Sequence, residues 1–373
     1  MSVARIAPER LAGPLDDSRQ DLRHRLLGLL TAGERLIGIH GAPQVGKSAI
    51  VARVLGEYET RNQAAVIRID LDGAYEPEVV HWQWARGLAR AIVGPVNMTH
   101  FLELDQDFWP ASSRSDRVLL QRTLGPLADV ALSPDPAPGG SETTRDLARA
   151  TEELARTRRT VVLVEHLEAP QLTPRHPVDV DQLLWDLRAT MQRTDDLQIV
   201  LVARSAVVDD VTGPDAAFVG DGTWVEVRSP PPSAWREIAA LLGIDGAAFV
   251  EEAIALTRGD VRAMQQLLAV SDATSARARF DEAASRADLL AARYLEHARS
   301  VHRYGAQLLI ALSRGVPPRS ERAGAMTPRE VNRALPKLAT AGLIFRKDTR
   351  AWSVSDPVVA HYLANRNRIS GPR

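Results

Sequence analysis

The sequence predicts an α/β fold: a mostly parallel sheet, then a helical unit, then a small basic unit. Apolar runs of strand length alternate with helical patterns over residues 35–227, and a proline-rich break at residues 229–232 closes this region. Residues 301–373 carry 13 Arg or Lys against four Asp or Glu, a charge of +9, although the whole chain carries −1. This asymmetry indicates two bodies with different partners.

Five strand signals define the expected sheet, of which the last is the weakest: residues 35–40, 64–70, 160–165, 197–203 and 224–227. Short apolar strands that alternate with helices favour parallel pairing with both faces covered. Helical patterns at residues 15–30 and 48–58 flank the first strand. A mostly helical stretch, residues 76–159, separates the second strand from the third, and its Pro/Gly-rich break at residues 133–141 predicts a surface loop.

The composition excludes several classes of protein. The chain has no cysteine, so disulfides, thiolate chemistry and cysteine-ligated zinc are excluded. Its longest apolar runs, residues 161–164 and 199–203, are far shorter than the ~20 residues of a membrane helix. Residues 1–10 lack the pattern of a secretory signal. We therefore expect a soluble cytoplasmic protein without membrane contact.

A glycine-rich turn follows the first strand and fits the Walker A pattern G-x-x-x-x-G-K-[ST]. Such a turn directs backbone amides at phosphate oxygens, and the next helix adds positive potential. We expect Lys47 to reach the β- and γ-phosphates of ATP and the Ser48 hydroxyl to ligate Mg²⁺. The predicted nucleotide-binding residues here are Gly41, Ala42, Pro43, Gln44, Val45, Gly46, Lys47, Ser48 and Ala49.

The third strand ends in an acid at the place where a P-loop site needs one. Four apolar residues precede Glu165, which resembles a Walker B motif with glutamate in place of aspartate, and we expect it to hold Mg²⁺. His166 occupies the next position, where a water-activating glutamate is usual. It is a candidate catalytic residue because a neutral imidazole can orient a water, although it is a poorer general base. Glu168 can substitute if the strand ends in a turn. These departures predict slow or partner-dependent hydrolysis.

The last part of the chain has the pattern of a winged helix-turn-helix. Residues 306–312 and 329–341 are helical, Thr327 and Pro328 start the second helix, and residues 343–346 and 351–354 form a hairpin. An alanine-rich helix is expected before it, at residues 280–298. The exposed basic residues are candidates for contact with double-stranded DNA: Arg329, Arg333, Lys337, Arg346, Lys347 and Arg350. A protein-binding or autoinhibitory role is the competing interpretation.

These motifs in this order resemble the AAA+/STAND superfamily, and most closely its archaeal-type ATPase and origin-recognition-like branch. The resemblance covers residues 22–363. It implies a P-loop NTPase core with a parallel five-stranded sheet (residues 1–229, with the insertion at 76–159), a helical lid (residues 230–299) and a winged-helix domain (residues 300–373). It also implies that Arg204 or Ser205 is the polar sensor 1 residue, and that Arg262 is a sensor 2 arginine that contacts the γ-phosphate.

The leading functional hypothesis is an ATP-binding molecular switch with weak or regulated ATPase activity. Nucleotide state is expected to act on the winged helix or on a homo-oligomer interface. One alternative is an ATP-dependent DNA-binding initiator or transposition-type loader. Another is a signalling or defence scaffold whose winged helix contacts protein. A small-molecule kinase is disfavoured because it would leave the C-terminal unit unexplained.

Overall fold

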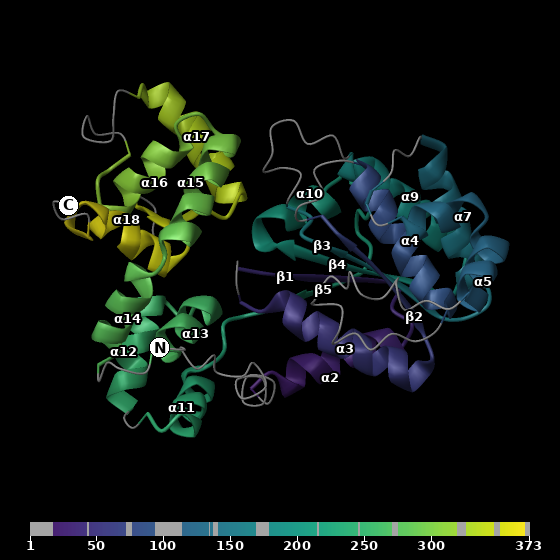
Figure 1. The fold of residues 1–373 in the computed structure, drawn as a ribbon, viewed down its shortest axis with the longest axis horizontal. Helices are drawn as coiled ribbons and strands as arrows, with labels where there is room; N and C mark the ends of the chain where they lie inside the picture. Colours follow the sequence, from purple (N-terminus) through teal and green to yellow (C-terminus); the bar gives the residue numbers. More distant parts are fainter. Residues whose placement is uncertain are drawn as a thin grey trace.

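The computed structural model describes residues 18–42, 45–71, 77–93, 114–133, 135–136, 141–168, 179–214, 216–244, 247–270, 275–318, 326–346 and 351–369. Four predicted site residues lie outside them: Pro43, Gln44, Lys347 and Arg350. Figure 1 shows two bodies, which we call the sheet body (residues 18–228) and the helical body (residues 229–369). None of the described helices is long and apolar enough to cross a membrane.

Five parallel strands form the sheet in the order β2-β3-β4-β1-β5. Their bounds are β1 Leu36–Gly41, β2 Ala65–Asp70, β3 Thr160–Glu165, β4 Leu197–Arg204 and β5 Thr223–Glu226. The predicted α/β fold with a five-stranded parallel sheet is confirmed. Because the strands are parallel, their carboxyl ends share one edge of the sheet, where open α/β sheets bind ligands.

Alternation along each strand divides the core between the two faces of the sheet. On β3, Val161 and Leu163 pack with α2 (Gln20–Thr31) and α3 (Lys47–Asn62). Val162 and Val164 pack on the other face with α4 to α7 and with α9 (Val180–Gln192). Figure 1 shows α2 and α3 below the sheet and α4, α7 and α9 above it.

The stretch between β2 and β3 is helical, as predicted, throughout most of its described residues. It contains α4 (Pro77–Val93), α5 (Arg114–Leu124), α6 (Pro126–Leu132) and α7 (Ser141–Ala155). Trp84 is fully buried, and its indole Nε1 donates to the Thr151 hydroxyl at 2.8 Å. That bond satisfies the one polar group of a large core side chain and fixes α4 against α7. After β4 the chain continues through a 3₁₀ turn (Ser205–Val207) and the short α10 (Val208–Thr212).

The lid region consists of short helices: α11 (Pro232–Leu241), α12 (Ala247–Thr257), α13 (Val261–Leu268), α14 (Ala276–Ser285) and α15 (Asp288–Val301). The single helix predicted over residues 280–298 is wrong, because α14 and α15 divide that stretch. The Ala287 amide bonds back to the Ala284 carbonyl and ends α14, and Asp288 then favours a new helix start by its negative charge.

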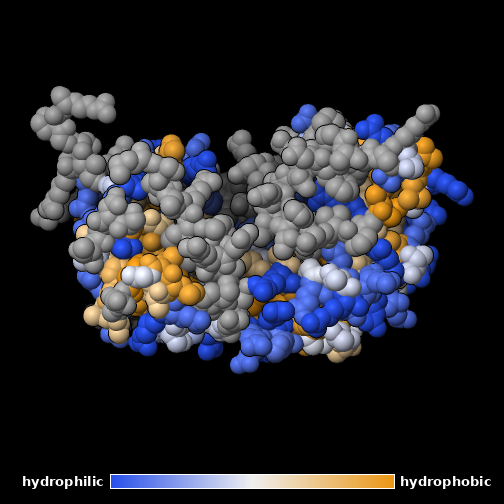
Figure 2. Space-filling model, turned by 60° about the horizontal axis from the view of Figure 1, so that its bottom comes forward, coloured by the Kyte–Doolittle hydropathy of each residue, from blue (hydrophilic) through white to orange (hydrophobic). Residues whose placement is uncertain are grey.

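In Figure 2 hydrophobic side chains gather on the surface of the helical body, at the left.

The C-terminal unit contains the predicted helices and hairpin: α16 (Gly305–Ser313), α17 (Pro328–Thr340), β6 (Ile344–Arg346), β7 (Trp352–Val354) and α18 (Pro357–Ile369). Thr327 and Glu330 form a capping box that starts α17. β6 and β7 are antiparallel, with Ile344 opposite Val354. The order of elements is as predicted, and the winged-helix assignment stays a prediction.

Helix α18 packs against both the lid helices and the rest of the C-terminal unit. Val358 belongs to the apolar core of the lid, and Tyr362 contacts the cores of both. His361 Nε2 lies 3.0 Å from Asp281 Oδ1 on α14, and its ring meets Phe280 edge-on. The lid and the C-terminal unit are therefore joined through shared apolar contacts. The domain boundaries predicted at residues 229–230 and 299–300 stay predictions.

Candidate functional site

The described residues of the turn between β1 and α3 fit the backbone of a phosphate loop. α3 begins at Lys47, directly after Gly46, whose φ of +84° lies in the left-handed region that favours glycine. A Cβ on Gly46 would come 2.8 Å from Nη1 of Arg19, and a Cβ on Gly41 would overlap the Val227 carbonyl. Glycine is thus required twice, and the first amides of α3 lack intrahelical acceptors, as at an anion-binding helix start.

Lys47 lies across this turn. Its Nζ donates to the carbonyls of Gly41 at 3.1 Å and Ala42 at 2.8 Å. Burial lowers the pKa of Lys47 to about 8, while the charge of Glu168 raises it and that of Arg204 lowers it. A desolvated ammonium gains free energy when an anion approaches, so this side chain is suited to a phosphate.

The remaining loop residues follow the same turn. Val45 is buried, and Ser48 is half-buried in the first turn of α3. Ala49 is exposed on the same turn. Ser48 therefore carries its hydroxyl at the helix start, where a Mg²⁺ ligand is expected. The roles of Val45, Ser48 and Ala49 in nucleotide binding stay predictions.

Glu165 ends β3 and is almost completely buried. Its Oε2 lies 2.5 Å from Nε of Arg68, a residue on the neighbouring strand β2. Its Oε1 has no hydrogen-bond partner within the described part of the chain. A buried carboxylate oxygen without a donor costs free energy unless a ligand or water satisfies it. Together with the Ser48 hydroxyl, this oxygen is the kind of donor that Mg²⁺ prefers, so the residues fit that ion.

His166 leaves the strand and turns toward β2. Its φ is +58°, a left-handed conformation that is uncommon for a residue with a side chain. The ring Nδ1 donates to Oδ1 of Asp70 at 2.7 Å, at the end of β2. The chain then returns to β4, where the Leu167 amide bonds to the Val202 carbonyl at 3.4 Å. His166 thus bulges out between two residues that stay with the sheet.

The bulge carries Glu168 to the end of β4, where it binds Arg204. Oε1 of Glu168 lies 3.0 Å from Nε of Arg204, and Oε2 accepts the Arg204 amide at 3.2 Å. In the pairing of β1 with β4, Arg204 is directly opposite Gly41, the first residue of the phosphate loop. Sequence reasoning placed Arg204 at the phosphate but treated Glu168 only as a substitute. The strand length did not reveal that a turn would bring it here.

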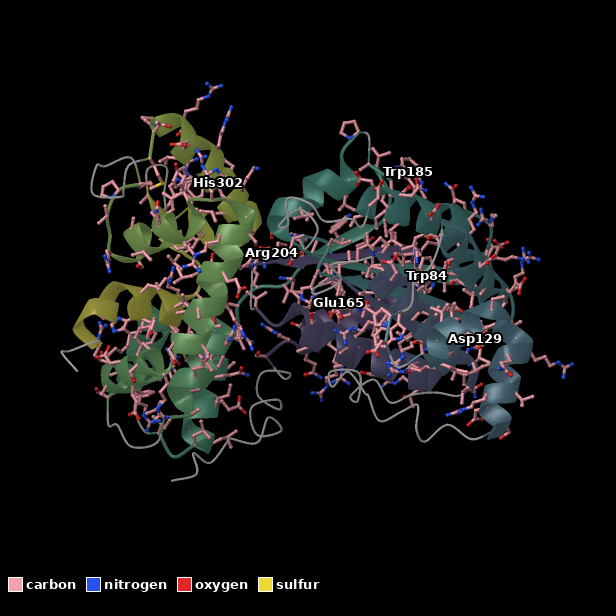
Figure 3. All side chains as sticks on the ribbon, turned by 45° about the horizontal axis from the view of Figure 1, so that its top comes forward. Trp84, Asp129, Glu165, Trp185, Arg204 and His302 are labelled. Carbon is pink, nitrogen blue, oxygen red and sulfur yellow. The ribbon has the colours of Figure 1, made fainter. Side chains whose placement is uncertain are left out.

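Arg204 also contacts the helical body. Gly342 follows α17 with a φ of +62°, and a Cβ at this position would overlap the Arg204 guanidinium. Figure 3 shows Arg204 where the two bodies meet, with Glu165 farther into the sheet body. One arginine therefore connects the carboxylate beside the phosphate loop with the C-terminal unit.

Arg262 lies in the first turn of α13 with an exposed side chain. Asp260 caps that helix by accepting the Ala263 amide at 2.8 Å. Burial raises the pKa of Asp260 to about 6, against the effects of its backbone hydrogen bonds and of the Arg262 charge. Burial also raises the pKa of Tyr294 on α15, and the charges of Arg262 and Arg204 both oppose that rise. Tyr294 and Asp260 both line the cavity beside the phosphate loop.

A cavity of about 250 Å³ opens beside the phosphate loop, between the two bodies. Its lining comes from the phosphate loop of the sheet body and from the helical body: Ala42, Val45, Ser229, Thr257, Arg258, Asp260, Tyr294, Phe345, Ser355 and Asp356. Sequence reasoning missed Arg258, which donates to the Val354 carbonyl at 3.0 Å and stacks over Phe345 at 5.0 Å. No local pattern could show that contact, since its partners lie 96 positions apart.

The predicted nucleic-acid residues that the structure describes are on the surface. Arg329, Arg333 and Lys337 are exposed along one face of α17, and Arg346 is exposed at the end of β6. Val331, Leu335 and Leu338 form the opposite, buried face of α17. Arg303 adds a further positive charge beside this face, although it pairs with Glu330. The described basic residues are therefore exposed on α17 and β6, and their partner stays a prediction.

Comparison with solved structures supports the fold. A Walker-type ATPase of Pyrococcus abyssi matches with a TM-score of 0.59 and 18% identity, over 92% of this chain and 95% of that one. The ORC1 protein of Aeropyrum pernix, solved in complex with DNA, matches with a TM-score of 0.51 and 17% identity, over 94% and 93%. Neither a family model nor a curated protein sequence matches the chain. The chain has the fold of these Walker-type P-loop ATPases.

Proposed function

We propose that this protein is an ATP-dependent molecular switch. ATP binds with Mg²⁺ at the phosphate loop, between the sheet body and the helical body, and nucleotide state controls how the two bodies attach. Hydrolysis is slow or depends on a partner. The observation that carries the proposal is the double contact of Arg204, which reaches Glu168 beside the phosphate loop and packs on Gly342 of the C-terminal unit.

The phosphate loop supports nucleotide binding by its own geometry. The helix start after Gly46 supplies amides, and Lys47 supplies a desolvated positive charge. Ser48 and Glu165 would hold Mg²⁺, which neutralises phosphate charge when bound. The adjoining cavity lies between the loop and the lid, as a nucleotide that bridges the two bodies requires. Adenine rather than guanine follows from the resemblance to ATPases.

Coupling would follow from the position of Arg204, which contacts both bodies at this site. A γ-phosphate next to Gly41 would lie beside Arg204, because these residues are paired across β1 and β4. An arginine drawn to phosphate must change its position relative to Glu168 and Gly342. Since α18 packs the lid and the C-terminal unit together, such a change would move them jointly.

Slow hydrolysis follows from the pairing of both acids. Glu165 is held by Arg68 and Glu168 by Arg204, so each carboxylate is already partly neutralised. Carboxylate oxygens that are held by a guanidinium are not free to orient a water molecule. Turnover would then require that Arg204 moves, which is a point where a partner or a second copy of the chain can act.

ATP binding to purified protein, measured by titration calorimetry with and without Mg²⁺, tests the premise. Lys47→Ala is expected to abolish binding, because the loop loses the one side-chain charge that it supplies. Lys337→Ala is the matched control, since it removes another of the three lysines from the exposed face of α17. Equal ATP affinity of Lys47→Ala and the unchanged protein would refute the proposal.

A second candidate function is DNA binding through α17. The exposed basic face favours it, and one protein of the same fold, ORC1, was solved in complex with DNA. Binding to duplex DNA should weaken as salt rises. Neutralising Arg333 and Lys337 should reduce the slope of the logarithm of the binding constant against the logarithm of salt concentration, by about 1 for each lost phosphate contact. No binding at low salt, or binding unaffected by both substitutions, would exclude it. Light scattering with ATP and ADP would show whether a homo-oligomer forms instead.

A further inference from the structure

Three of the four residues at positions 165–168, at the end of β3, are polar, and the structure gives each a different partner. Glu165 faces Arg68, His166 faces Asp70, and Glu168 faces Arg204 beside the phosphate loop. We propose that Glu168 is the catalytic carboxylate of ATP hydrolysis, the group that positions the attacking water and accepts its proton. The proposal rests on the proposed function, because it requires ATP at this loop.

The register of the sheet places Glu168 nearer to the phosphate loop than the other two. Arg204 is opposite Gly41, and the Arg204 amide donates to Oε2 of Glu168. Adjacent strands lie about 4.8 Å apart, so the strand end that Glu168 binds is one strand spacing from the loop. Its charge acts on Lys47, the side chain expected at the terminal phosphates. Glu165 is instead opposite Asp70 of β2, the neighbour of β3 that lies away from β4 and the loop.

The bulge at His166 explains why the acid is displaced along the sequence. In a strand that continued straight, the residue after Glu165 would be the next group at the sheet edge. Here the left-handed His166 turns its ring toward Asp70, and Leu167 takes the place next to β4 through its bond to Val202. Bulges commonly re-aim a side chain beside an active site. Glu168 therefore occupies the position that the sequence pattern assigned to His166.

The reaction at this site is balanced as follows. The water oxygen bonds to the γ-phosphorus as the bond from that phosphorus to the bridging oxygen breaks, and the electron pair stays on ADP. The water proton passes to Glu168 and then to inorganic phosphate. Both oxygens of Glu168 are engaged by Arg204 in this structure, so the base becomes available only when Arg204 turns to the phosphate. This arrangement predicts slow turnover.

Two measurements on substituted protein test the assignment, and neither depends on the other. Glu168→Gln is nearly isosteric and keeps an acceptor for the Arg204 amide. It should slow single-turnover hydrolysis at least about 100-fold. It should also raise the affinity for ATP relative to the affinity for ADP by roughly tenfold, because a negative charge near the third phosphate is lost. Glu168→Asp should slow hydrolysis while it leaves the ATP-to-ADP affinity ratio unchanged, so it serves if Glu168→Gln fails to fold.

The control is Glu153→Gln, an exposed glutamate of α7 that also pairs with an arginine and lies away from the loop. It should change neither quantity. The assignment is overturned if Glu168→Gln hydrolyses ATP like the unchanged protein, if His166→Asn alone abolishes turnover, or if Glu168→Gln leaves the ATP-to-ADP affinity ratio unchanged. Absence of ATP binding by the unchanged protein would instead refute the proposed function, so the two failures can be distinguished.

Discussion

Gly342→Ala should separate the contribution of the Arg204 contact from ordinary backbone strain. Gly342 has a φ of +62°, and a Cβ there would overlap the Arg204 guanidinium. Gly315 offers a matched control in the same C-terminal unit. It has a φ of +69° and also follows a helix, but nothing lies within 4 Å of its expected Cβ. Both substitutions strain the backbone alike, and only Gly342→Ala displaces the arginine.

The expected magnitudes follow from these two effects. A left-handed alanine costs about 1 kcal/mol relative to glycine, so Gly315→Ala should lower the free energy of unfolding by about that amount. Gly342→Ala must also push Arg204 away from Glu168, a buried partner at 3.0 Å. Loss of a hydrogen-bonded charge pair costs about 1.5–3 kcal/mol. The total for Gly342→Ala is therefore about 3 kcal/mol.

Urea unfolding of three proteins (unchanged, Gly342→Ala and Gly315→Ala), each with and without Arg204→Ala, provides the measurement as double-mutant cycles. Without the Arg204 side chain, the cost of Gly342→Ala should fall to about 1 kcal/mol, the same as for Gly315→Ala. Two results would refute the reasoning. One is an equal cost for both glycine substitutions in the unchanged background, and the other is an excess for Gly342→Ala that survives removal of Arg204.

Two further predictions concern the lid. Burial raises the pKa of Asp260 from 3.8 to about 6, so the folded state binds its proton more tightly than the unfolded state. The stability that this group contributes, roughly 3 kcal/mol, is present below pH 4 and is lost as pH rises to 6. Asp260→Asn should therefore remove this pH dependence from the free energy of unfolding measured between pH 4 and 7. An identical slope in the variant would contradict this. Arg258→Ala should lower the free energy of unfolding by about 1–2 kcal/mol, because the hydrogen bond to the Val354 carbonyl is lost. Arg258→Gly should lower the free energy of unfolding by less than Arg258→Ala does, since glycine adopts the φ of +57° without strain. Urea unfolding in which Arg258→Gly is the less stable of the two variants would contradict this.

Local patterns were sufficient to predict the sheet and the phosphate loop. Each strand is a short apolar run, and the loop needs glycine and lysine at fixed spacing, so both leave a signal within a few residues. The helix predicted over residues 280–298 was wrong because alanine-rich composition does not show where tertiary contacts end one helix and begin another.

The arrangement of the site depended on contacts that no local pattern records. The left-handed turn at His166 moves the acid beside the loop from the expected position to Glu168. Arg204 was predicted from its place at a strand end, but its contact with Gly342 joins residues from different bodies. Such pairs are set by packing of the helical body on the sheet edge, so only the folded chain shows them.

Distance between the two bodies, with and without ATP, tests the switch most directly. The chain has no native cysteine, so spin labels can be attached at Glu153→Cys on α7 and at Gln307→Cys on α16, both exposed. We expect pulsed electron resonance to show that ATP with Mg²⁺ changes the distance distribution, whereas ADP does not, and that Lys47→Ala abolishes the change. Identical distributions with and without ATP, in labelled protein that demonstrably binds ATP, would contradict the account.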